Sequence, residues 1–139
     1  MFGNLSLQQY IFGNIKMPQF DLQKHCLRSL NRVLQDQKKE TNEISWEVIN
    51  PKGSHAIAVG IDAPIEVIIT GSTGYYCGGM NQHANITVKG SVGPGVAENM
   101  MSGKVVIEGD ASQYAGATGQ GGLLVIKGNA SSRCGISMK

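Results

Sequence analysis

Four short stretches of the sequence decide the fold: residues 67–71 read VIITG, 86–90 read ITVKG, 105–109 read VVIEG, and 124–128 read LVIKG. Each is an aliphatic or β-branched run that ends in glycine, and the spacing between them is 19 residues each time. The glycines are Gly71, Gly90, Gly109 and Gly128. The same register continues further on through Cys77, Val96, Ala115 and Cys134. A period that holds at several positions predicts a repeat architecture.

Each 19-residue repeat is expected to form one coil of a parallel β-helix. Three or four β-branched or aliphatic residues favour a short strand, and the glycine after it is expected to supply a turn with positive φ. A second strand is expected around Cys77 or Ala115. Nineteen residues are too few for a strand-plus-helix repeat, which needs about 30, and they do not fit a hexapeptide helix. The sequence therefore predicts a mainly β protein with coils about 4.8 Å apart.

The alternation of residues along each strand assigns its two faces. The first and third residue of every run are aliphatic, so these eight side chains are expected inside the solenoid. The second positions then point outward, and three of them are apolar: Ile68, Val106 and Val125. An outward aliphatic row needs a cover, which either the N-terminal segment of this chain or a partner subunit could provide. These three residues are the candidate interface.

The cysteines are expected to be reduced. Cys77 and Cys134 occupy one repeat position three coils apart, which separates them by about 14 Å. A disulfide needs Cα atoms within about 7 Å, so both are predicted to be unpaired, inward core residues. With Cys26 the count is odd, and the first residues lack the pattern of a signal peptide. This combination indicates a cytoplasmic protein.

The N-terminal half departs from the repeat. Residues 1–20 are expected to form an arm that lies on another surface, followed by one helix-plus-β-helix domain over residues 21–139. Helical spacing of apolar residues predicts a helix over 22–38, with Asp21 as its N-cap. Strands are expected at 44–49, 56–59 and 65–70. The helix is expected to cap one end of the solenoid or to cover its side.

Composition and motifs argue against several classes of function. A balance of 12 Lys+Arg against 10 Asp+Glu gives a net charge of +2 without a basic stripe, which argues against nucleic-acid binding. No apolar run approaches the roughly 20 residues of a membrane span. The histidines, His25, His55 and His83, share no metal-ligand spacing, so no catalytic, cofactor-binding or metal residue is assigned. The roles of His55 and His83 stay open.

The glycine-rich turns at 93–95 and 119–122 raise the question of phosphate binding. Neither contains the Gly-Lys-Ser/Thr sequence of a P-loop, and no helix is expected after them. The repeat explains these glycines as turns. Direct flavin or nucleotide binding at these turns is kept as the weakest alternative.

Several segments together resemble a known family. Residues 71–81, 93–103, 115–118 and 122–130 resemble the GXGXG domain, the β-helical C-terminal domain of the glutamate synthase large subunit. This domain also occurs as a free-standing subunit in N-methylglutamate synthase-like complexes. The free-standing type is the nearest, because the helical segment 22–34 and the loop 50–55 match it too. The likeness spans about residues 21–139, and the run GPGVAENMMSG at 93–103 is its most specific part.

The resemblance implies a right-handed β-helix with an architectural role in nitrogen metabolism. In the family the glutaminase nucleophile and the FMN and iron–sulfur sites lie on other domains or subunits, and no catalytic residue of the family maps onto this chain. We therefore expect a non-catalytic scaffold of a glutamate synthase-like oxidoreductase. It would brace glutaminase-type and FMN-binding subunits around the ammonia path.

The C-terminal end of the repeat leads to an alternative. The chain stops at Lys139 before the fourth coil is finished, whereas family members continue through further coils. We expect either a fragment or another chain that covers this end. The alternative function is a self-assembling β-helical structural or binding module, a homo-oligomer formed through open coil ends.

Overall fold

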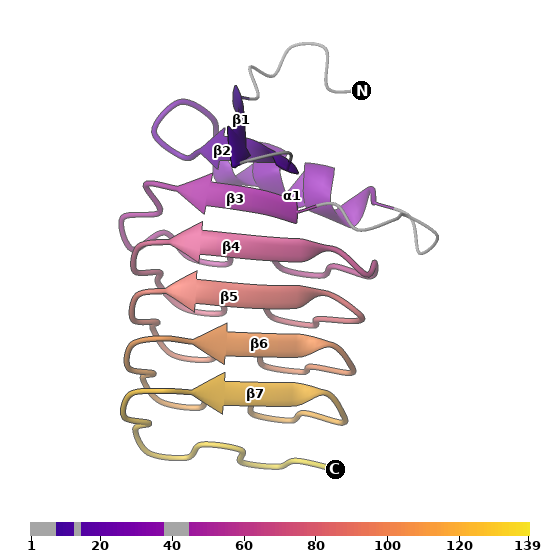
Figure 1. Cartoon of the computed structure of the whole chain (residues 1–139). Coiled ribbons are helices and arrows are strands. Elements are labelled where there is room, and N and C mark those ends of the chain that lie inside the picture. Colours follow the sequence, from indigo (N-terminus) through magenta and orange to yellow (C-terminus); the bar gives the residue numbers. More distant parts are fainter. Residues whose placement is uncertain (1–7, 13–14, 38–44) are drawn as a thin grey trace.

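The protein is a β-solenoid with one short helix, as the computed structural model of residues 8–12, 15–37 and 45–139 shows (Figure 1). Its seven strands form one sheet in sequence order. The first two pair antiparallel, and all later pairs are parallel. The elements are β1 (Gln8–Phe12), β2 (Ile15–Asp21), α1 (Leu27–Gln35), β3 (Ser45–Ile49), β4 (Glu66–Thr70), β5 (Asn85–Lys89), β6 (Lys104–Ile107) and β7 (Leu123–Ile126).

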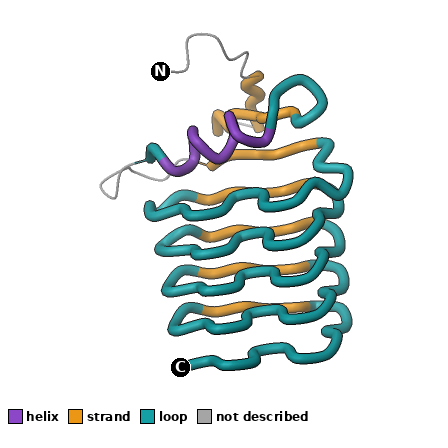
Figure 2. The backbone as a smooth tube through the Cα atoms, turned by 180° about the vertical axis from the view of Figure 1, so that it is seen from behind, coloured by secondary structure: helices purple, strands orange, loops and turns teal. Residues whose placement is uncertain are grey.

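The coils wind in a right-handed sense. In Figure 1 the strands run leftward at the front, and the chain returns behind them while it descends. Figure 2 shows the return path from behind, where loops and turns replace strands. A right-handed crossover is the sense that strand twist favours when successive strands are parallel. The predicted handedness is therefore confirmed.

The inward columns follow the predicted register. Val67 pairs with Ile86, Ile86 with Val105, and Val105 with Leu124, so these side chains stack in one column. The inward side chains of β4, β5 and β6 are at most 1% exposed. Leu124 and Ile126 of β7 are half-buried and pack against the same core. Full burial of each such aliphatic side chain contributes about 1.5–3 kcal/mol, so this column supplies much of the stability of the fold.

The four repeat glycines lie at the turns after the strands, but the expected reason for them applies only to Gly71. Its φ is +127°, whereas Gly90, Gly109 and Gly128 have φ outside the positive range. A Cβ at Gly90 would lie 2.6 Å from the carbonyl carbon of Gly71, and one at Gly128 would lie 2.5 Å from the carbonyl oxygen of Gly109. Adjacent coils stack so closely at this corner that a side chain has no room.

The second strand expected around Cys77 and Ala115 is absent; turns occupy these positions. Tyr76, Gly78 and Met80 have φ of 61°, 68° and 56°, which a β-strand does not allow. Successive amides still bond to neighbouring coils: Tyr76 N donates to the carbonyl of the coil below at 2.8 Å and Gly78 N to the coil above at 2.9 Å. The expected strand at 56–59 is wrong for the same reason, since Ala56 and Ala58 also have positive φ.

The N-terminal segment contains more regular structure than expected. Instead of an arm, β1 and β2 form a hairpin, and β2 extends the parallel sheet by pairing with β3. The strand expected at 44–49 is confirmed as β3, and the strand expected at 65–70 as β4. The expected arm includes residues 1–7 and 13–14, and the strand expected at 44–49 includes residue 44. These residues lie outside the described part of the chain.

The helix is shorter than expected, because turns occupy residues 22–24. Its N-cap is Cys26, without a side-chain capping bond. The Asp21 carboxylate instead accepts hydrogen bonds from the backbone of Gln23 at 2.8 Å and from the side-chain amide of Asn50 at 3.0 Å. Asp21 therefore organises the turn before the helix. The C-terminal side of the expected range reaches residue 38, which lies outside the described residues.

Helix α1 caps the N-terminal end of the solenoid, one of the two positions expected for it (Figures 1 and 2). Leu30, Val33 and Leu34 are fully buried in the core. The Asn31 side chain fastens the helix to the first coil: its amide donates to the carbonyl of Ala56 at 2.8 Å, and its oxygen accepts from the amide of Ala58 at 2.9 Å. None of the described helical residues forms a segment long and apolar enough to cross a membrane.

Candidate functional site: the outer sheet face

The outward aliphatic row lies along the middle of the sheet. Register places Ile68 beside Thr87, Thr87 beside Val106, and Val106 beside Val125. All four side chains are half-buried, because the longer outward side chains of their own strands flank them. We call this row with its flanking side chains the outer sheet face.

The cover that the N-terminal segment was expected to provide is not formed by the described residues. In Figure 1, α1 lies at the solenoid end, and the β1–β2 hairpin extends the sheet edge. Neither of these described elements lies over strands β4 to β7. That prediction is therefore wrong for residues 8–12 and 15–37, while the alternative, a partner subunit, stays a prediction.

Charged side chains flank the row and differ between its two ends. On β3 and β4 they are acidic, and hydrogen bonds hold both carboxylates. Glu47 accepts from Gln19 Nε2 at 3.1 Å and from Thr70 Oγ1 at 2.9 Å, while Glu66 accepts from a serine hydroxyl at 3.3 Å. On β5 to β7 and the turns that directly follow them, the charged side chains are exposed: Lys89, Lys104, Glu108, Asp110 and Lys127.

The small polar residue after each repeat glycine links one coil to the next. Ser72 Oγ accepts from the amide of Ser91 at 3.2 Å, Ser91 Oγ from the amide of Asp110 at 3.1 Å, and Asp110 Oδ1 from the amide of Asn129 at 2.8 Å. Each amide that donates this bond belongs to the equivalent residue one repeat later. The pattern visible in the sequence is thus a structural ladder.

The three histidines lie in separate environments. His55 stacks on Tyr75 with ring centroids 3.9 Å apart, and its Nδ1 accepts from the Tyr75 amide at 3.0 Å. His25 meets Phe20 edge-on at 5.3 Å between ring centroids. No group of three potential metal ligands among His, Cys, Asp and Glu occurs within the described part of the chain.

His83 forms an ion-pair contact that sequence reasoning missed. Its Nδ1 lies 3.0 Å from Asp62 Oδ1, and both side chains are exposed by more than 40%. The two residues are 21 positions apart, so the 19-residue period brings them to neighbouring coils at one corner. An exposed pair of this kind contributes little to stability.

The cysteines are all unpaired, as predicted, but only Cys77 has the expected environment. It is fully buried, and burial raises the pKa of its thiol to about 12. Cys134 is exposed, because it lies in the last coil, which no further described coil covers. Cys26 is also exposed, and a hydrogen bond with the Ser29 hydroxyl lowers the pKa of its thiol.

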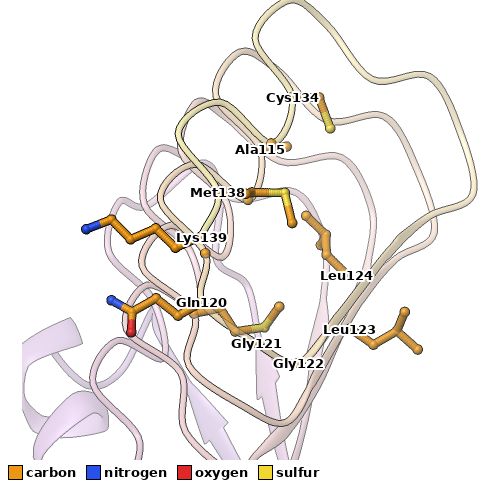
Figure 3. Close-up of a pocket in the computed structure, with 13 residues that line it drawn as sticks. Ala115, Gln120, Gly121, Gly122, Leu123, Leu124, Cys134, Met138 and Lys139 are labelled. Atoms are coloured by element: carbon orange, nitrogen blue, oxygen red, sulfur yellow. The ribbon is translucent and has the colours of Figure 1, made fainter.

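The open interior of that last coil forms an apolar hollow. It has a volume of about 340 Å³, and Leu124, Cys134 and Met138 point into it (Figure 3). Cys134 occupies in this coil the repeat position that Cys77 and Ala115 occupy in earlier coils, where their side chains are buried. The hollow is thus a continuation of the solenoid core, and its shape follows from the fold.

The glycine-rich turns are explained by close stacking as well. A Cβ at Gly93 would lie 2.7 Å from the carbonyl carbon of Gly74. One at Gly121 would lie 2.5 Å from the carbonyl oxygen of Met101. Coil packing accounts for Gly93 and Gly121, whereas Gly95 and Gly122 have φ of 74° and 89°, the turn conformation that favours glycine. A phosphate ligand is not needed to explain these glycines.

Comparison with known proteins relates the chain to a longer protein. It is similar to Protein GlxC of Rhizobium meliloti (strain 1021), with 68% identity over 88 residues. The matched segment covers 63% of this chain and 39% of the relative, so it spans well under half of that protein's length. No protein-family model matches the chain. No solved structure matches it significantly either.

Proposed function

We propose that this chain is a non-catalytic scaffold of a glutamate synthase-like complex, in which it braces glutaminase-type and FMN-binding subunits around the ammonia path. The observation that carries the proposal is the outer sheet face. It combines a rigid, hydrogen-bonded platform with an outward aliphatic row that the described N-terminal elements leave open. Apolar rows on a regular surface are typical of protein–protein contacts.

The GXGXG resemblance supports the choice of partners, and the similarity to GlxC is consistent with it. In this proposal the chemistry of the complex, including FMN and iron–sulfur clusters, resides on the partner subunits of the oxidoreductase. The chain contributes shape and contacts. Its three free cysteines are consistent with a reducing, cytoplasmic setting.

Co-expression with glutamate synthase-type glutaminase and flavin-binding subunits tests the proposal. The wild-type chain is expected to purify as a complex of defined mass that carries flavin absorbance. The substitution Val106→Asp places a charge in the aliphatic row and is expected to abolish the complex. Gln113→Asp, at an exposed position outside the sheet, is the matched control and should leave the complex intact.

The proposal fails if the wild-type chain stays free of both subunits, or if Val106→Asp and Gln113→Asp behave alike. Far-UV circular dichroism of both variants establishes that each keeps the solenoid. Equal spectra with unequal binding assign the effect to the surface and not to folding.

The second candidate is a self-assembling β-helical module. Its supporting observation is the open last coil, where Leu123 is 52% exposed and Met138 is 66% exposed. Sedimentation velocity over a dilution series separates the two candidates. Self-assembly predicts a mass that rises with concentration in the absence of any partner, whereas the scaffold proposal predicts a constant mass for the chain alone.

A further inference from the structure

The outer sheet face carries opposite charges at its two ends. Strands β3 and β4 present Glu47 and Glu66 outward. The three strands that follow, with the residue after each, carry three lysines and one glutamate: Lys89, Lys104, Lys127 and Glu108. Lys89 and Lys104 occupy outward strand positions, Glu108 and Lys127 directly follow the inward residues Ile107 and Ile126, and the exposed Asp110 lies at the corner after β6. The sheet therefore separates charge along the solenoid axis.

The charged groups at the two ends also differ in the number of hydrogen-bond and ion-pair partners that they have within the chain. At the acidic end, Glu47 is half-buried and accepts two hydrogen bonds, and Glu66 accepts one. At the basic end, Lys89, Lys104 and Lys127 form no ion pair with any other residue in the described ranges. The register places Glu108 between Lys89 and Lys127, so the face has an excess of positive charge beside Val106 and Val125.

Resting on the function proposed above, we propose that the partner surface seated on Val106 and Val125 is acidic, with carboxylates that meet Lys89, Lys104 and Lys127. An acidic partner surface would pair these ammonium groups around an apolar centre, which is the usual arrangement of a polar rim about a hydrophobic core. The charge difference along the face also fixes orientation. A partner turned end for end would place its carboxylates against Glu47 and Glu66, which is repulsive.

A second copy of this chain is a less suitable occupant. A two-fold arrangement would have to match three lysines with the acidic end of the other copy. That end offers one exposed carboxylate, Glu66, because Glu47 is already engaged by Gln19 and Thr70. Even with Glu108 of the other copy added, three ammonium groups meet two exposed carboxylates and leave charge unpaired, which a more acidic partner surface would not do.

The experiment measures binding of the FMN-loaded, glutamate synthase-type flavin-binding subunit to the immobilised full chain. The double substitution Lys104→Glu/Lys127→Glu is expected to weaken binding about tenfold or more at low salt, mainly through a slower association rate. The difference should shrink near 1 M salt, where the Debye length is about 3 Å. Lys24→Glu/Lys52→Glu, at exposed turn positions outside the strands, is the charge-matched control and should bind like the wild type.

The outcomes separate this inference from the proposed function. If Val106→Asp abolishes binding while the double lysine variant binds like the wild type, the acidic-partner inference is wrong and the scaffold proposal stands. If the wild-type chain does not bind the flavin-binding subunit, the inference is wrong, and the scaffold proposal also fails if the chain does not bind the glutaminase-type subunit. If the wild-type chain dimerises alone and the lysine reversals abolish the dimer, the occupant is a second copy and the inference is overturned.

Discussion

Replacing Gly90 by alanine tests whether close coil stacking, and not backbone conformation, requires glycine at the repeat corner. The new Cβ would lie 2.6 Å from both the carbonyl carbon and the oxygen of Gly71. The neighbouring backbone cannot rotate away as a side chain would, because the Gly71 amide bonds to the Lys89 carbonyl at 3.2 Å. The coils must therefore separate locally.

The expected cost follows from two opposing effects. Overpacking of a well-packed interior typically costs 1–3 kcal/mol, and a backbone clash belongs at about the upper end of that range. Alanine also restricts the unfolded chain, which offsets about 0.4–1 kcal/mol. Gly90→Ala should therefore lower the free energy of unfolding by about 2 kcal/mol. With an m-value of about 1–3 kcal/mol/M, the midpoint of urea unfolding falls by about 1 M.

Gly53→Ala is the matched comparison, because it separates conformation from stacking. Gly53 has φ of +73°, and a Cβ there would meet no heavy atom within 4 Å. The left-handed conformation costs roughly 1 kcal/mol for alanine, and the same unfolded-state effect offsets part of it. Urea unfolding followed by circular dichroism measures both variants. If Gly90→Ala is no more destabilising than Gly53→Ala, the stacking explanation is wrong.

Three further predictions concern the helical cap, the thiols and the Asp21 carboxylate. Asn31→Ala removes the side chain that joins α1 to the first coil and should lower the free energy of unfolding by about 1–2 kcal/mol, measured by urea unfolding, because partly buried backbone groups lose their partners. In native protein, a thiol reagent should label Cys134 at once and Cys77 only after unfolding; equal labelling would contradict the burial of Cys77. The hydrogen bond from Asn50 holds the pKa of Asp21 below 3.8, so its stabilising effect is present above the unfolded pKa and is lost as pH falls below about 4. Acid unfolding of Asp21→Asn should lack this part of the pH dependence; an unchanged acid transition would contradict the role of the carboxylate.

Much of the candidate site could be predicted, because the face to which each strand residue points depends only on its position in the repeat. Once Val67 is placed inward, alternation sends Ile68 outward, and the 19-residue period carries the assignment to Val106 and Val125. The outward row was therefore accessible from residue order alone. The Asp62–His83 contact was missed, although the same period brings these residues to one corner.

The remaining differences arise where contacts are not periodic. In the sequence, a glycine at the coil corner indicates a turn. Only the distance between the stacked backbones shows that a side chain at position 90 would clash with the neighbouring coil. The segment around Cys77 is predicted to be a strand because small residues recur there in the repeat register. Its alternating left-handed residues become visible only with the bonds to the coils above and below.

The sequence by itself determined the repeat, the inward columns and the outward aliphatic row, since each depends on residue type and spacing along one chain. The tertiary structure decided where the N-terminal elements lie, why most of the corner glycines are needed, and how charge is distributed over the outer sheet face. The physical reason is that these features depend on approach distances between coils and on long-range contacts such as Asn31 with Ala56, which no local pattern encodes.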